Sequence, residues 1–227
     1  MFITIRKKFI LYLLSGILII VCVVTYFSLA KKTTTPAPQF SIVIDAGHGG
    51  RDGGCVGSSG ITESELNLMY ARKLASLCEE FGMEVTMTRK DMNGLYDENA
   101  TNKKRSEMEK RRKIINESGA DVMVSIHMNA FPLSSSEGAH VFYAKGSESG
   151  FELAKSVQTS VCSNFGTARK YVSVGDYYVL NFSDMPAILV ECGFLSNPTE
   201  EQLLQSEDYC EKFCYSLFAG VLAYFQM

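Results

Sequence analysis

The chain has 227 residues, a net charge of −3 at pH 7 and 46% hydrophobic residues. The body of the chain contains no long basic run, so nucleic acid is not an expected partner. Seven cysteines are present and none forms a CxxC pair, which argues against a zinc ribbon and against a thioredoxin-like motif. Residues 40–227 are of a size that one well-buried domain can fill.

The N-terminal segment predicts export of the body. Basic residues at positions 6–8 precede an apolar run, Phe9 to Ala30, that is long enough to cross a bilayer. Residues 1–30 are therefore either a transmembrane anchor, which the length of the run favours, or a signal peptide, since residues 28–30 resemble a cleavage site. The basic flank places the body on the outer face of a bacterial membrane. Residues 31–39 are polar, contain proline and predict a linker.

The first half of the body begins with an apolar strand at residues 42–45, which stops at a glycine-rich turn carrying His48. A helix then begins near Thr62, because Thr62 and Glu65 have the spacing of a capping box, and it ends at Gly82. The elements expected next are an alternating strand at 84–89 and a charged helix at 106–118.

The second half continues to alternate strands with helices. One apolar strand ends in His127 and another ends in Glu191. The expected elements are strands at 122–127, 139–144, 177–181 and 187–191, and helices at 149–164 and 206–225. This alternation predicts an α/β domain with a largely parallel sheet.

Three of the apolar strands lead to residues that can bind a metal ion or transfer a proton: His48, His127 and Glu191. Binding sites of parallel sheets form at the carboxyl ends of the strands, so we expect these residues to share one site. The two histidines can bind a metal ion, and a catalytic zinc takes three protein ligands. Of the two nearby acids, Glu65 is engaged by the helix cap, so Glu63 is the expected third ligand.

Two histidines and one carboxylate suit one Zn²⁺ per chain, although another divalent ion is not excluded. Cys55, in the loop near His48, is a less favoured fourth ligand. Glu191 follows four apolar residues, so desolvation should raise its pKa and suit it to general base catalysis; the alternative is a carboxylate paired with an arginine. Cys192 should face the other side of the strand. We interpret His140, inside a strand, as a partly buried imidazole with a hydrogen-bond partner; a less favoured alternative is that it faces the cleft.

With these residues in place, the body from Ser41 to the C-terminus resembles the zinc-dependent N-acetylmuramoyl-L-alanine amidases of amidase family 3. The resemblance implies a twisted, mostly parallel sheet of about six strands flanked by helices. It also implies that His48, Glu63 and His127 are the zinc ligands and that Glu191 is the catalytic acid/base. The matching segments are Ile44-Asp-Ala-Gly-His-Gly-Gly50, Gly60-Ile-Thr-Glu-Ser-Glu-Leu-Asn67, Thr88-Arg89 with Asp91, Arg111 with Asn116, Val124-Ser-Ile-His-Met-Asn-Ala130 and Pro186-Ala-Ile-Leu-Val-Glu-Cys-Gly-Phe-Leu-Ser-Asn197.

The domain lacks flanking wall-binding repeats, and the stretch between His127 and Glu191 is short for an autoinhibitory helix. It is most similar to the sporulation and germination-specific subgroup, which strips stem peptides from muramic acid in spore cortex before muramic-δ-lactam forms. The resemblance implies a peptidoglycan substrate, a site of action such as the forespore intermembrane space, and a protein partner for activation or localisation.

Two alternative hypotheses compete with a zinc-dependent amidase. One is a zinc peptidase that cuts the stem peptide itself, which the absence of an HExxH motif weakens. The other is a catalytically silent wall-binding or partner-binding protein, against which the intact set of His48, Glu63, His127 and Glu191 argues.

Overall fold

Residues 7–30 and 40–226 are described by the computed structural model, in two units, Met1–Pro38 and Gln39–Met227. The first unit contains α1 (Lys7–Ala30), a single helix of 24 residues. The predicted linker, residues 31–39, lies outside the described residues. In the part of the chain that the structure describes, no helix is both long and apolar enough to cross a membrane.

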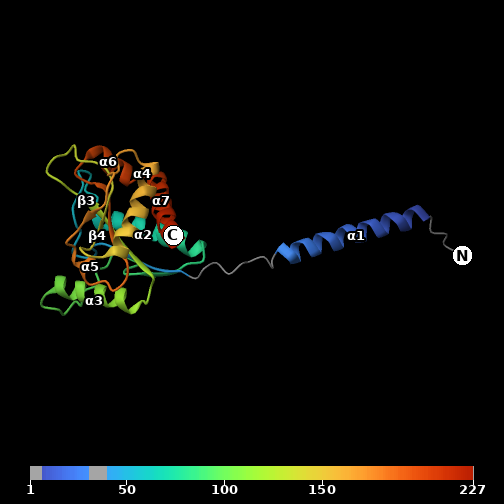
Figure 1. Ribbon diagram of the computed structural model, residues 1–227, viewed down its shortest axis with the longest axis horizontal. Helices are drawn as coiled ribbons and strands as arrows, with labels where there is room; N and C mark the ends of the chain where they lie inside the picture. The colour runs from blue at the N-terminus through green and yellow to red at the C-terminus, as the bar shows by residue number, and fades with distance from the viewer. Residues whose placement is uncertain (1–6, 31–39, 227) are drawn as a thin grey trace. The chain divides into compact units, whose positions relative to one another are not determined.

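The second unit is built on a six-stranded sheet in the order β2-β1-β3-β6-β4-β5. Two of its strands, β3 and β4, are labelled in Figure 1. Its strands are β1 (Ser41–Ala46), β2 (Glu84–Met87), β3 (Val122–Asn129), β4 (His140–Tyr143), β5 (Ser173–Val174) and β6 (Ala187–Phe194). The pairs β1–β2, β1–β3 and β3–β6 are parallel, whereas β4 runs antiparallel to β6 and parallel to β5. The predicted α/β fold with a mostly parallel sheet is confirmed.

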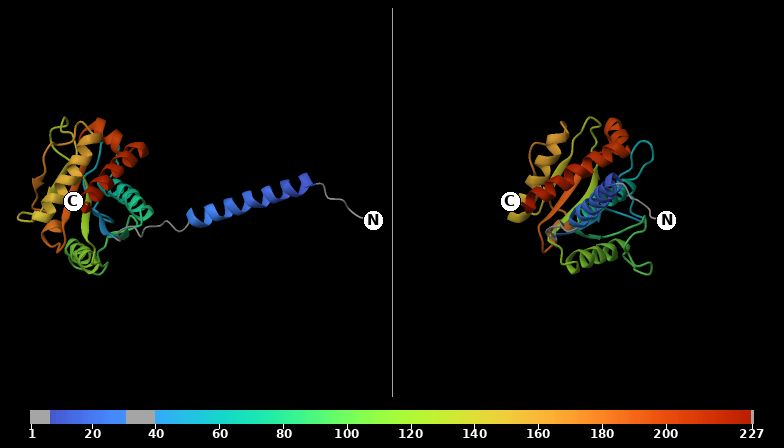
Figure 2. Two further views of the ribbon diagram at one scale, coloured as in Figure 1. Left: turned by 45° about the vertical axis from the view of Figure 1, so that its right-hand side comes forward. Right: turned by 90° about the vertical axis from the view of Figure 1, so that its right-hand side faces the viewer.

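Helices cover both faces of the sheet. They are α2 (Glu63–Glu80), α3 (Lys103–Glu117), α4 (Glu148–Asn164), α5 (Tyr178–Asn181), α6 (Pro198–Leu204) and α7 (Glu207–Phe225). Figure 2 shows α3 on the opposite side of the sheet from α4 and α7. The central strands are largely apolar because both of their faces are buried. In β1, Ile42 and Ile44 belong to the larger hydrophobic core, which lies between the sheet and α2, α4 and α7. Val43 belongs to the smaller hydrophobic core on the other face, together with Ile115 of α3.

Two element predictions differ from the structure. Residues 177–181 were expected as a strand, but they contain the short helix α5, whose adjacent Val179 and Leu180 are both buried. So short a segment offers too few residues for a helical or a strand period to be read. The second difference is α6, which was not expected; it begins where the side chain of Asn197 accepts hydrogen bonds from the backbone N–H groups of Thr199 and Glu200.

Candidate metal centre

The turn that follows β1 carries His48 and is built around a glycine that has no room for a side chain. A Cβ at Gly47 would lie 2.3 Å from Cε1 and Nε2 of His127, so the imidazole packs directly on the backbone. His48 has a φ of 60°, which residues other than glycine seldom adopt. Two guanidinium groups hold this turn: Arg111 Nη2 donates to the carbonyl of His48 at 3.0 Å, and Arg89 Nη2 donates to that of Gly47 at 2.9 Å.

A buried polar network ties the turn to the sheet and to α3. Asp45 forms an ion pair with Arg111 and accepts hydrogen bonds from Ser125 Oγ at 2.6 Å and Thr88 Oγ1 at 2.7 Å. Although burial opposes its ionisation, Arg111 and these donors hold the pKa of Asp45 below its ordinary value. The pairing of Thr88 and Arg111 with Asp45 was not predicted, because only the fold brings α3 and the segment after β2 to Asp45.

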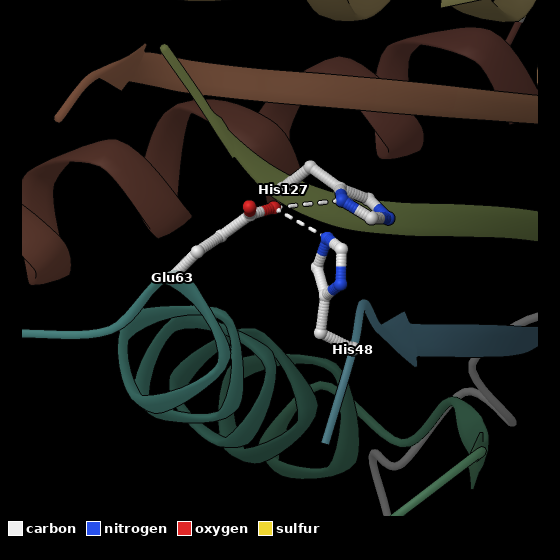
Figure 3. A group of neighbouring side chains, drawn as sticks. All are labelled: His48, Glu63 and His127. Atoms are coloured by element: carbon white, nitrogen blue, oxygen red, sulfur yellow. Dashed lines mark hydrogen bonds and ion pairs between the residues drawn. The ribbon is translucent and has the colours of Figure 1, made fainter. Parts of the chain in front are cut away.

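Glu63 is the first residue of α2, and the helix cap fixes its direction. The predicted capping box is present: the Thr62 side chain accepts from the backbone N–H of Glu65, and the Glu65 side chain accepts from that of Thr62. Glu63 thereby points at the two imidazoles (Figure 3). Its Oε1 lies 3.1 Å from Nε2 of His48 and 2.9 Å from Nδ1 of His127.

The carboxylate of Glu63 is buried and ionised. Its Oε1 also accepts from the backbone N–H of Met128 at 3.2 Å, and its Oε2 accepts from that of Cys55 at 3.0 Å. Burial opposes ionisation, but His127 and His48 hold the pKa of Glu63 well below its usual range. Burial also lowers the pKa of His48, and the nearby carboxylates of Glu63 and Asp52 outweigh this effect, so the net shift of His48 is upward.

Among the described residues, His48, Glu63 and His127 form the group whose ligand atoms can hold a metal ion, with these atoms within 4.8 Å of one another. Two imidazole nitrogens and one carboxylate oxygen match the ligand sets of catalytic zinc sites. Cys55 is not part of this group. Its Sγ approaches the carbonyls of Met128 and Asn129, and burial raises the pKa of its thiol to about 12.

Glu191 lies on β6 directly beside this group, in register with His127 of β3. Burial raises the pKa of Glu191 to about 7, against the opposing charge of His127. The alternative interpretation of Glu191, a carboxylate paired with an arginine, is not supported in residues 40–226, where Oε2 of Glu191 has no hydrogen-bond partner. Cys192 faces the larger core, as expected. On the other side of Glu191, in register on β4, lies His140.

A cavity of about 210 Å³ opens beside His48 and His127. Its lining includes Lys104 from α3, Tyr177 at the N-cap of α5 and Tyr178, the first residue of α5. Lys104 also forms an ion pair with Asp52, whose other oxygen lies 3.0 Å from Nδ1 of His48. These lining residues were not predicted, because residues 177–181 were expected as a strand and Lys104 lies outside the helix expected at 106–118. The cavity gives a ligand access to both histidines.

Comparison with known proteins agrees with this geometry. Residues 42–223 match the Amidase_3 model, described as N-acetylmuramoyl-L-alanine amidase. A germination-specific N-acetylmuramoyl-L-alanine amidase of Bacillus subtilis (strain 168) is 34% identical over 86% of this chain and 84% of its own length. Among solved structures, the CwlD amidase from Clostridioides difficile, in complex with the GerS lipoprotein, superposes with a TM-score of 0.80 at 36% identity, over 83% of this chain and 99% of that one.

A second solved structure, an N-acetylmuramoyl-L-alanine amidase from Clostridium difficile 630, superposes with a TM-score of 0.74 at 33% identity and covers 83% of this chain and 97% of its own. The family match spans the sheet, the turn of His48, and the strands of His127 and Glu191. The chain belongs to the Amidase_3 family of N-acetylmuramoyl-L-alanine amidases.

Proposed function

We propose that this chain is a zinc-dependent amidase that cleaves the amide between N-acetylmuramic acid and the L-alanine of the peptidoglycan stem peptide. The main support for the proposal is that His48, Glu63 and His127 converge at the carboxyl ends of the parallel strands, with Glu191 beside them. Membership of the Amidase_3 family favours this reaction over cleavage within the stem peptide and over a catalytically silent wall-binding role.

The zinc ion would be held by Nε2 of His48, Oε1 of Glu63 and Nδ1 of His127. The fit is supported by the donor set and by the way one carboxylate oxygen already faces both imidazoles. When bound, zinc supplies Lewis acidity for the attack of water on an amide carbonyl. The residues behind the ligands would fix their orientation: Asp52 behind His48, and the backbone N–H of Met128 behind Glu63.

Glu191 would move the proton. Its pKa of about 7 lets the carboxylate accept a proton from the attacking water near neutral pH and return it to the departing amine of L-alanine. Its register with His127 keeps it within one strand spacing of that metal ligand. The scissile amide would enter through the cavity beside His48, between Lys104 and Tyr177.

The biological setting that fits best is maturation of spore cortex, on the muramic-δ-lactam pathway. This is supported by the germination-specific relative from Bacillus subtilis and by the CwlD structure. That structure contains the GerS lipoprotein, which supports a protein partner that activates or localises this chain as well. Residues 1–30 would direct export, residues 31–39 would form a linker, and residues 40–227 would act on the outer side of the membrane.

Mass spectrometry of peptidoglycan digests tests the reaction. The purified full chain is incubated with peptidoglycan alone, with a chelator, and with chelator followed by added zinc. We expect free stem peptides that begin with L-alanine, together with peptide-free muramic acid. These products should vanish with the chelator and return with zinc. The Glu191→Gln variant, which keeps all three ligands, is the matched control.

Each outcome distinguishes the alternatives. Shortened stems that remain attached to muramic acid would contradict the amidase and support a peptidase. The digest is also run with a lysate of sporulating cells, so that a requirement for a partner appears as activity only with lysate. No released stem peptide in either condition would refute the proposed function.

A further inference from the structure

His140 is an imidazole outside the metal group that faces Glu191 from the neighbouring strand. In the antiparallel pair β4–β6, His140 is in register with Glu191, and in the parallel pair β3–β6, Glu191 is in register with His127. Residues paired in this way project from the same face of the sheet. Glu191 therefore stands in a row between two imidazoles, of which only His127 belongs to the candidate metal group.

Two atoms of this row are buried without partners. Within residues 40–226, neither Nε2 of His140, which was expected to have a partner, nor Oε2 of Glu191 has a hydrogen-bond partner, and both are shielded from solvent. An imidazole N–H is a donor and a carboxylate oxygen is an acceptor, so the two atoms are complementary. Buried polar atoms are nearly always paired in folded proteins, and cross-strand side chains begin about 5 Å apart at Cβ. A hydrogen bond between these facing side chains would satisfy both atoms.

Two aromatic side chains pack against the ring of His140 and hold it in place. It packs on Phe142 with ring centroids 4.3 Å apart and meets Tyr171 edge-on at 5.2 Å. Burial, with the nearby charge of Arg169, lowers the pKa of His140, which favours the neutral imidazole with a single N–H. The aromatic neighbours fix the plane of the ring, and Glu191 is the acceptor that faces it across the strands.

We propose that His140 is a positioning residue for Glu191: its Nε2–H donates to Oε2 and leaves Oε1 free to face the reacting water. The proposal rests on the proposed function, because it assigns a task to the neighbour of the residue that moves the proton. A carboxylate held by one oxygen has a defined direction at the other, which proton transfer requires. His140 itself touches neither the metal ligands nor the substrate in this scheme.

Two variants of the full chain test the pairing, and a third is the control. His140→Phe keeps a ring against Phe142 and removes the donor, whereas His140→Gln keeps a donor. We expect His140→Phe to lower kcat by about tenfold or more, with KM and zinc content unchanged, and His140→Gln to restore most of the loss. Tyr171→Phe, which alters the neighbouring ring without removing a buried donor, should retain wild-type kcat.

A crystal structure of the zinc-loaded protein gives a readout that does not depend on turnover. We expect Nε2 of His140 and Oε2 of Glu191 to lie about 2.7–3.2 Å apart. A different donor at Oε2, such as the hydroxyl of Tyr177, would overturn the proposal. So would a His140→Phe variant whose kcat stays within about twofold of wild type. If the wild-type chain releases no stem peptide, the proposed function fails, while the crystallographic distance still decides whether the pair forms.

Discussion

Replacing Gly47 by alanine would test how closely the metal centre is built on the backbone. The new Cβ would lie 2.3 Å from Cε1 and Nε2 of His127, about 1 Å nearer than the 3.4 Å at which ordinary contact begins. The backbone is not free to retreat, because the carbonyl of Gly47 accepts hydrogen bonds from Arg89 and Asn67. The imidazole must therefore move. A shift of about 1 Å at a catalytic group costs about 10²-fold in rate, and disturbed ligand orientation costs about 10–100-fold in metal affinity.

The assay combines three measurements on the Gly47→Ala protein: zinc affinity by competition with a chelator of known affinity, turnover by mass spectrometry of released stem peptides, and thermal unfolding to verify the fold. Gly53→Ala is the matched control. Its Cβ would meet Cγ2 of Thr62 at 3.5 Å, which is ordinary contact, so zinc affinity and turnover should be retained. Wild-type zinc affinity and turnover in Gly47→Ala would refute the reasoning.

Three further predictions follow from the same centre. Glu191→Gln should keep zinc and lose turnover by about 10²-fold or more, the scale of a lost general acid/base; near wild-type turnover would remove Glu191 from its role. Because the pKa of Glu191 rises from 4.5 to about 7 on folding, its contribution to the free energy of unfolding of the metal-free chain is complete below pH 4.5 and is lost as the pH rises through 7. Urea unfolding at pH 4.5 and pH 8 should show this loss in the wild type and not in Glu191→Gln. Arg111→Met leaves Asp45 buried without its cation and should lower the free energy of unfolding by about 3–5 kcal/mol; a urea midpoint equal to that of wild type would contradict the buried ion pair.

The apolar strands were predictable because burial on both faces leaves a plain signal in the sequence. Residues 42–45, 122–127 and 187–191 are each largely apolar, and each range lies within a strand of the sheet. The reactive residues His48 and His127 stand at or just beyond the ends of such runs. Their convergence on Glu63 followed from a general property of parallel sheets together with the capping box at Thr62, both of which are local or topological rules.

Features that depend on distant pairing were not predictable in the same way. The strand at 139–144 was expected, but its antiparallel direction depends on the connection that brings it to β6, and this direction places His140 opposite Glu191. β5 is two residues long and exists only through its pairing with β4. The ion pair of Asp45 with Arg111 joins residues 66 positions apart, which no local pattern relates.

Two arginines from different elements converge on the turn of His48, and this has a consequence for the order in which the enzyme assembles. Arg111 reaches the turn from α3, and Arg89 reaches it from the segment after β2 and also donates to the carbonyl of Ser64 at 2.8 Å. The turn has its working shape only after both elements have docked. We therefore expect a chain that has folded in part to carry both histidines without their shared geometry, so that the proposed metal site would form only after both elements have docked.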